Sequence, residues 1–247
     1  MPIHIIHIDG RLLFEADAED VRDAVERAVD QGVDLAGANL GGAQLRGADL
    51  KDASLRGADL RAARLDGSNV EHSDLSSARL DDASARGANF ENSSLAGASL
   101  ARANLEGANL EKVQLEDALL EGAQAVRANF ERARMTRIRA RGAVLRLSNL
   151  EKCDLREAEL TDTDLSGANL EKCDLRDARL LGTKLVGANV EKADLRGADL
   201  SAADLRDANL EKCQVEGACL DGAALGGANL DGMSGRLRSR DGSGPYR

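Results

Sequence analysis

The sequence predicts an all-β solenoid, in which the chain winds into stacked four-sided coils of twenty residues each. Two observations lead to this prediction: a five-residue repeat, A-(D/N)-L-x-x, that runs through residues 33–232 without a slip, and a twenty-residue spacing of its polar positions. A third observation argues against a conventional core, because only 2% of the residues are aromatic and none is Trp. The chain must therefore bury its apolar surface in another way.

The five-residue repeat decides which side chains point inward. Every fifth residue from Leu35 to Leu230 is apolar, and thirty-one of these forty positions are leucine. The residue two positions earlier is nearly always small, most often alanine. A straight helix cannot use this spacing, because successive leucines would point in directions about 140° apart. A chain that turns a corner every five residues instead keeps the leucine and the small residue inside and the other three residues outside.

The polar positions repeat every twenty residues, as expected if four corners complete one coil. Asparagine recurs at this spacing from Asn69 to Asn229, and glutamate recurs from Glu71 to Glu211, followed in most coils by lysine or arginine. Coils stacked at about 4.8 Å would place these residues in columns. We expect the asparagines to bond turn backbone and to form amide rows, and the basic residues to offset repulsion within the glutamate column.

On these motifs the sequence resembles the pentapeptide-repeat proteins over residues 33–232. The resemblance implies a right-handed quadrilateral β-helix of about ten 20-residue coils, a rod on the order of 48 Å long. Some members of this family resemble B-form DNA in size, shape and charge. Those members occupy the DNA-binding saddle of DNA gyrase or topoisomerase IV and protect these enzymes from quinolones or other poisons.

Residues 1–32 are expected to form an N-terminal cap, because a solenoid exposes apolar surface at each end. Two apolar segments, Ile3–Ile8 and Leu12–Phe14, flank Asp9-Gly10, a strong hairpin signal. Asp17 is expected to open a helix that Gly32 closes. The sequence therefore predicts a β-hairpin and an α-helix below the first coil.

Residues 233–247 form a basic tail, for which we expect a flexible chain and no helix long enough to cover the last coil. Two arrangements are open at this end. The last coil stacks on another copy of the chain, which gives a homodimer through the C-terminal coil, or Met233 and Leu237 cover it.

The sequence carries no recognisable catalytic motif. The three histidines, His4, His7 and His72, have no second set of metal ligands at a matching spacing. There is no glycine-rich phosphate loop and no nucleophile motif, and the acidic residues recur in registered columns, which is typical of a solvated face. We therefore predict a protein that is not an enzyme and that uses no metal or cofactor.

The apolar runs and the cysteines bear on location. No run approaches eighteen apolar residues, and the N-terminus has no secretion signal, so we expect a cytoplasmic protein that does not enter a membrane. Cys153, Cys173 and Cys213 occupy small inward positions, where they are expected to act as apolar side chains in the reduced form. Cys219 is expected to point outward and to be a candidate for reaction.

The formal charge of −10 is unevenly distributed along the chain. Residues 126–147 contain seven arginines and one glutamate, whereas residues 148–232 contain eighteen acidic and ten basic residues. We name the seven arginines the arginine belt; they are Arg127, Arg132, Arg134, Arg137, Arg139, Arg141 and Arg146. All seven are expected at outward positions.

Two interpretations of the arginine belt are open. In the structural one the arginines pair with acidic residues one coil away: Arg137 with Asp117 and Glu157, Arg134 with Asp154, and Arg141 with Glu121. In the functional one the belt binds an acidic surface of a partner protein.

Two functions follow as hypotheses. The first is a DNA mimic that binds DNA gyrase or topoisomerase IV and protects it from a poison, through an acidic face formed by Glu151, Asp154, Glu171, Asp174, Asp194 and Glu211. Its charge density is lower than that of DNA, at one net charge per about 5 Å against one per about 1.7 Å. The second is a rigid scaffold or adaptor unrelated to topoisomerases. Free nucleic acid is not expected as a direct partner, because an acidic rod repels it.

Overall fold

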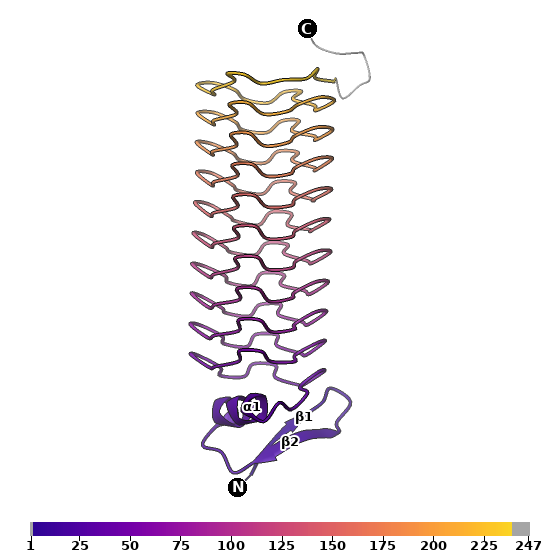
Figure 1. Ribbon diagram of the computed structural model, residues 1–247, viewed down its shortest axis with the longest axis vertical. Helices are drawn as coiled ribbons and strands as arrows, with labels where there is room; N and C mark the ends of the chain where they lie inside the picture. Colours follow the sequence, from indigo (N-terminus) through magenta and orange to yellow (C-terminus); the bar gives the residue numbers. More distant parts are fainter. Residues whose placement is uncertain (1, 239–247) are drawn as a thin grey trace.

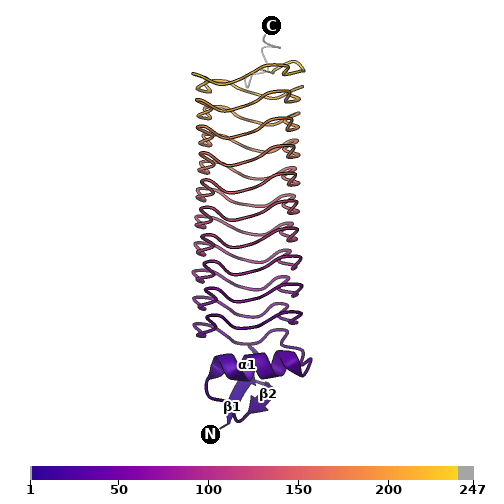
Figure 2. The same ribbon diagram turned by 60° about the vertical axis from the view of Figure 1, so that its left-hand side comes forward.

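The computed structural model describes residues 2–238 of the 247-residue chain. A two-stranded antiparallel hairpin, β1 (Ile3–Ile6) and β2 (Leu12–Ala16), precedes a single helix, α1 (Val21–Asp30). From there the chain rises as a column of coils that stack above one another in both views (Figure 1 and Figure 2). The hairpin and helix lie at one end of this rod, and the last described coil lies at the other.

The coils are joined by short parallel backbone bridges between residues twenty positions apart. These bridges run from Asn39, paired with Asp59, to Gln214, paired with Ser234. From residue 35 to residue 215 the N–H of the inward residue, most often leucine, donates to a carbonyl of the coil above, as from Leu40 to Asp59 at 2.8 Å. The predicted twenty-residue step is therefore present in the backbone. The rungs continue beyond residue 232 and end at Arg238, which pairs with Cys219 one coil below.

Each corner of a coil is a β-turn that starts at the inward leucine. The leucine carbonyl accepts from the small residue three positions later, as from Ala43 N to Leu40 O at 3.1 Å. The third residue of each turn has a φ between +54° and +75°, which is the conformation of a type II turn. From residue 37 to residue 232 this position holds glycine or a residue without β-branching, as the left-handed conformation requires.

The interior of the rod is formed by the leucine and small-residue columns. The inward leucines from Leu35 to Leu210 are at most 3% exposed. Larger side chains are balanced by smaller ones nearby: Phe130 follows Ala125 at the preceding corner, and Ile138, at the end of one turn, is followed two residues later by Ala140 at the start of the next. The volume enclosed by a coil is thereby kept close to that of its neighbours, as close packing demands.

Polar side chains at the small inward positions satisfy their hydrogen bonds within the wall of the rod. Thr163 Oγ1 donates to Ala140 O at 2.8 Å, and Cys153 Sγ donates to Phe130 O at the same distance. Burial raises the pKa of the Cys153 thiol well above its usual range, and burial raises the pKa of Cys213 to about 11. These thiols therefore stay protonated and act as small core residues.

The prediction that Cys219 is an exposed, reactive thiol is wrong. Its side chain is only 1% exposed, and its Sγ lies 3.2 Å from Ser201 Oγ. The rung at Arg238 lies directly above Cys219, and Arg238 Nη2 reaches back to Gly197 O at 3.3 Å. The cysteine is buried because the coil continues past the residue where the repeat motif was expected to stop.

An amide ladder runs along one face of the rod. From Asn89 to Asn229, each asparagine Nδ2 donates to the Oδ1 of the asparagine one coil below, at 2.9–3.3 Å. Each Oδ1 also accepts from the backbone N–H two residues on, as at Glu151 (3.2 Å). The ladder ends at Asp49, whose carboxylate accepts from Asn69 at 3.0 Å. The expected amide row is therefore present, and its hydrogen bonds all run in the same direction along the rod.

The N-terminal end is covered by the hairpin and α1. Asp20 is the N-cap of α1, with its Oδ1 accepting from Asp23 N at 2.9 Å, so the expectation that Asp17 opens the helix is wrong by three residues. Ile8 N donates to Gly37 O, which pairs the hairpin with the first coil. Glu26 of α1 accepts from Asp49 N at 2.9 Å, at the foot of the amide ladder.

The C-terminal end is more open. In the last full coil, Leu220 and Leu225 are only partly buried, and Leu230 is 38% exposed. The residues that follow include the predicted tail, of which residues 239–247 lie outside the described part of the chain.

Candidate functional site

The predicted acidic face is neutralised by neighbouring basic side chains. Each of its six carboxylates forms an ion pair with a lysine or arginine one or two residues later: Glu151 with Lys152, Asp154 with Arg156, Glu171 with Lys172, Asp174 with Arg176, Asp194 with Arg196, and Glu211 with Lys212. The repeat thus places acid and base side by side, and little uncompensated charge is left on these residues.

The aspartates of this face form a continuous ladder with the arginines. Arg156 donates twice to Asp154, at 2.8 and 2.6 Å, and its Nε lies 3.7 Å from Asp174 of the next coil. The same geometry recurs between Arg176 and Asp194, at 3.7 Å. The hydrogen bonds from Arg156 hold the pKa of Asp154 below its usual range. We call this surface the Asp–Arg ladder.

Four arginines of the arginine belt are also paired, but not all with the expected residues. Arg137 forms the predicted pair with Asp117, at 2.7 Å. Arg134 pairs with Glu116 at 2.7 Å and not with Asp154, whose carboxylate is already held by Arg156. The other two paired arginines are Arg132, 3.6 Å from Glu131, and Arg141, 3.9 Å from Asp162 and not paired with Glu121 as expected.

The remaining three arginines of the belt, Arg127, Arg139 and Arg146, have no ion pair with any residue in 2–238. Arg139 lies in a groove of about 550 Å³ whose lining includes Glu157, Glu159 and Asp177. Arg127 and Arg146 are exposed on neighbouring coils, and Arg127 N donates to Arg146 O at 3.0 Å. The backbones of these two residues are therefore joined, and neither side chain is paired with a carboxylate of the described residues.

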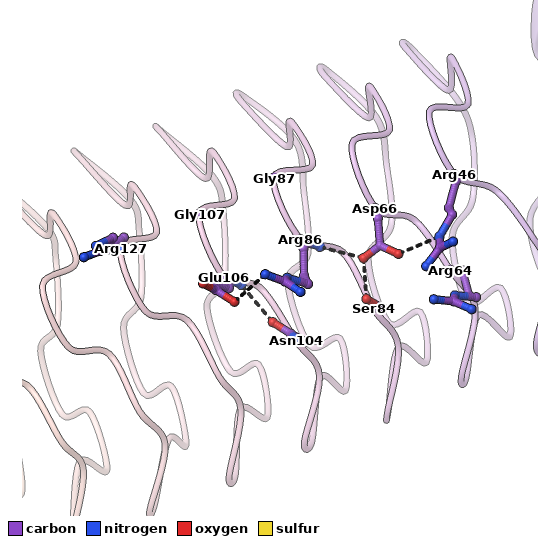
Figure 3. A pocket seen from close by; sticks show the side chains of 10 residues that line it. All are labelled: Arg46, Arg64, Asp66, Ser84, Arg86, Gly87, Asn104, Glu106, Gly107 and Arg127. Atoms are coloured by element: carbon purple, nitrogen blue, oxygen red, sulfur yellow. Dashed lines mark hydrogen bonds and ion pairs between the residues drawn. The ribbon is translucent and has the colours of Figure 1, made fainter.

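Arg127 also lies at one end of a second and larger groove of about 650 Å³ (Figure 3). The groove is lined by Arg46, Arg64, Asp66, Ser84, Arg86, Gly87, Asn104, Glu106, Gly107 and Arg127. Its four arginines face only two carboxylates. Arg46 pairs with Asp66 at 3.0 Å and Arg86 pairs with Glu106 at 2.9 Å. We call it the arginine groove.

The two carboxylates of the arginine groove are fully engaged. Asp66 accepts from Ser84 Oγ and from Arg86 N in addition to Arg46. Arg64 forms no ion pair with any described residue, and its exposed guanidinium lies at the opposite end of the groove from Arg127 (Figure 3). The groove therefore presents two unpaired positive charges, one near each end.

An exposed apolar side chain lies one coil beyond Arg127. Leu147 is 51% exposed and adopts a φ of +58°, at a corner column that holds glycine in most coils. Its side chain leans toward Gly167 of the next coil, where a Cβ would lie 2.7 Å from Leu147 Cδ2. Val126 and Val144 on the same face are partly buried. The arginine groove is thus followed along the rod by a small apolar surface.

Sequence reasoning found Arg127 and Arg146 but missed Arg64 and Leu147. Both missed residues lie on the same face of the repeat. The signal for Leu147 is visible in the sequence: the corner column from Gly47 to Gly227 is interrupted only at Arg127, Leu147 and Asp207. Arg64 has no such signal, because its lack of a carboxylate partner depends on side-chain geometry.

The described part of the chain shows neither a metal site nor a membrane span. Within residues 2–238, no group of three or more histidine, cysteine, aspartate or glutamate side chains is arranged to hold a metal ion. The one helix there, α1, is too short and too polar to cross a membrane.

The fold and its surfaces define a four-sided β-solenoid whose outer faces differ in charge. Residues 31–67 and 73–222 match the family model described as pentapeptide repeats, in eight copies that partly overlap. The chain therefore belongs to the pentapeptide-repeat family, whose members fold as right-handed quadrilateral β-helices.

The solved structures that are similar to this chain include HetL and QnrB1. HetL, a pentapeptide repeat protein involved in heterocyst differentiation regulation from the cyanobacterium Nostoc sp. strain PCC 7120, is 33% identical with a TM-score of 0.75; the match covers 91% of this chain and 99% of HetL. QnrB1, a plasmid-mediated fluoroquinolone resistance protein, is 21% identical with a TM-score of 0.57, covering 71% of this chain and 89% of QnrB1. The likeness to QnrB1 concerns the fold alone. Comparison with curated proteins found no significant match.

Proposed function

We propose that this protein is a rigid, non-enzymatic adaptor that binds a partner protein through the unpaired arginines of its belt. The observation that carries this proposal is the contrast in charge between faces. Arg127 and Arg146, on neighbouring coils, are exposed and have no ion pair among the described residues, whereas the predicted acidic face is neutralised pair by pair. Exposed charges that a fold leaves unpaired are available for recognition and for steering a partner of opposite sign.

The similarity to HetL is in keeping with such a role. HetL is involved in a regulatory process, and its match with this chain extends over nearly its whole length. Four free cysteines, all buried, agree with the reducing conditions of the cytoplasm, where we place this function.

The proposal is tested by quantitative affinity enrichment with the full chain as bait. We expect specific partners to be depleted when Arg139 and Arg146 are both changed to Glu, because the reversal replaces attraction with repulsion. The matched control reverses two charges outside the belt, Arg22→Glu and Lys184→Glu, and keeps the partners. If the bait with the reversed belt arginines and the control bait enrich the same proteins equally, the belt is not a docking site.

Topoisomerase binding is the second candidate, supported by the net charge of −10 and by the fold shared with QnrB1. Among the described carboxylates, Glu157, Asp177 and Asp207 form no ion pair and remain available to a basic saddle. DNA mimicry requires that stoichiometric amounts of the protein inhibit gyrase supercoiling or reduce poison-induced cleavage. If the protein shows neither of these effects at micromolar concentration, this candidate is excluded.

A homodimer through the C-terminal coil is compatible with both candidates. The partly exposed Leu220, Leu225 and Leu230 offer an apolar surface at that end of the rod. Sedimentation at high micromolar concentration should then show a dimer, and a monomer under those conditions would remove the idea.

A further inference from the structure

The geometry points to a specific ligand class for the arginine groove: an extended acidic segment of a partner protein, with an apolar side chain that packs on Leu147. This inference deepens the proposed adaptor function and rests on it. Three properties of the surface support it, namely the charge of the groove, the spacing of its unpaired arginines, and the exposed leucine beyond them.

The charge of the groove selects an anion. Asp66 and Glu106 are held by Arg46 and Arg86, so the guanidiniums of Arg64 and Arg127 have no counter-charge in the described structure. A ligand carboxylate can accept two parallel hydrogen bonds from a guanidinium, which makes arginine well suited to this recognition. Two separate arginines call for two separate carboxylates.

The spacing of the two arginines matches an extended chain lying along the rod. Arg64 and Arg127 belong to coils three steps apart, which corresponds to a separation along the rod of about 14 Å at about 4.8 Å per step, and Arg64 precedes the corner column of Arg127 by three residues. In an extended strand, side chains on one face recur every second residue, and residues four apart are separated by about 13 Å. Acidic residues at positions i and i+4 of the ligand would therefore reach Arg64 and Arg127.

Leu147 extends the same register by one step. It lies one coil beyond Arg127 in the same corner column, about 19 Å from the coil of Arg64. Residue i+6 of an extended ligand lies about 20 Å from residue i and on the same face. An apolar side chain at i+6 would then cover Leu147 and the neighbouring Val144.

Glycine would suit the backbone at residue 147 better than leucine does. Its left-handed backbone favours glycine, which most coils have at this corner, and half of its side chain is exposed to solvent. An exposed leucine in a conformation that disfavours it is explained if a ligand covers it.

The test uses a fluorescent nonapeptide with Glu at positions 2 and 6, Leu at position 8 and Ser or Thr elsewhere, together with its reversed sequence. Fluorescence anisotropy with the full chain should show saturable binding of at least one of the two, weakened by added salt. A peptide of the same composition with the second Glu moved to position 5 places that carboxylate on the opposite face. It should bind about tenfold more weakly.

Three glycine substitutions in one corner column provide matched variants. Arg127→Gly should weaken binding about tenfold and Leu147→Gly about five- to tenfold, through the loss of one charged contact and one apolar contact. Asp207→Gly, four coils beyond Arg127, should leave binding within about twofold of wild type. All three variants restore the residue found in most coils, so their melting temperatures should not fall.

Four outcomes would overturn the inference. The first two concern the peptides: neither peptide binds below about 1 mM, or the shifted peptide binds as tightly as the original one. The third is that all three glycine variants lose the same affinity. The fourth is that a short DNA duplex binds more tightly than the peptide and displaces it. The result is separable from the proposed function. If the peptide binds as described but the belt reversal depletes no partner, the adaptor function fails while the groove remains a peptide site.

Discussion

The coils of the arginine belt, residues 126–147, and the coils that follow them have the same five-residue repeat. They differ in how charged side chains are arranged on the outside of the rod. In the following coils, aspartate and arginine lie two residues apart, on either side of an inward leucine, and neutralise each other, as Asp154 and Arg156 do. In the belt, the position of the aspartate is taken by Arg134 or Arg139, and three arginines remain unpaired. The comparison teaches that the rod needs its interior sequence to fold but not any one arrangement of outer charges.

The interior differs between the two regions as well. The following coils keep leucine and a small residue at nearly every corner, whereas the belt has Ala125, Met135, Ile138 and Ala140. The inward positions of the belt and those from residue 148 to residue 218 are equally well buried. The predictions below begin with this interior and end with the outer ion pairs.

The largest effect is expected from a leucine of the following coils. Leu170 is fully buried, so Leu170→Ala should lower the free energy of unfolding by about 2–5 kcal/mol through lost burial and a residual cavity. In the belt the opposite change, Ala140→Leu, should cost about 1–3 kcal/mol because the large side chain of Ile138, two residues earlier, already occupies the neighbouring inward position. Chemical denaturation followed by circular dichroism measures both.

A double variant serves as the control for this interior comparison. Ile138→Ala combined with Ala140→Leu restores the size order of the other coils and should recover most of the stability lost by Ala140→Leu alone. If the double variant is less stable than both single variants, the two neighbouring inward positions do not compensate for each other's volume.

The amide ladder should give an intermediate effect, because it crosses both regions. Asn149 donates to Asn129, and its Oδ1 accepts from Asn169 and from Glu151 N. Asn149→Ala removes these bonds and leaves partly buried partners unsatisfied, so we expect a loss of about 1–3 kcal/mol in denaturant unfolding. Gln114→Ala removes an exposed amide without a side-chain hydrogen bond and should change stability by less than about 0.5 kcal/mol.

The smallest effect should come from the outer ion pairs, and it should depend on pH. Hydrogen bonds from Arg156 and Arg196 lower the pKa of Asp154 and of Asp194 in the folded protein. Their contribution to stability is therefore present above the unfolded value of about 4 and is lost as the pH falls through the lowered pKa values. Thermal unfolding between pH 6 and pH 2 should show this loss.

Replacing Asp194 by asparagine, which carries no charge, isolates the contribution of this ion pair to stability. In Asp194→Asn, the melting temperature should be slightly lower than wild type at pH 6, and the two proteins should converge in acid. A constant difference across the whole range would show that the charge of Asp194 does not contribute.

Much of the fold could be predicted because its cause is periodic. The leucine column, the small column and the Asn69–Asn229 spacing each repeat often enough to define corner, coil and register. The cap was less regular, and Asp20, not Asp17, begins the helix because its side chain reaches Asp23 N. A single capping contact leaves a weaker signal than a repeated one.

The candidate site was harder to predict because side chains do not follow the backbone register. Arg134 is bridged to Asp154 along the backbone, as its spacing implies, yet its guanidinium turns toward Glu116 in the coil below. Which arginines remain unpaired depends on such choices between nearby carboxylates. Cys219 was misjudged for a related reason, since the coil that buries it lacks the repeat motif.

The twenty-residue step has a consequence for how such a rod can change in length. Removing one whole coil would bring the two ends of the rod about 4.8 Å closer together. Every remaining residue would stay in its own column, above a residue of the same repeat position. Removing a single five-residue unit would instead rotate everything beyond the cut by a quarter turn, so that the asparagines of one part would meet the arginines of another. Lineages of this protein can therefore gain or lose length in whole coils while each face of the rod keeps its orientation.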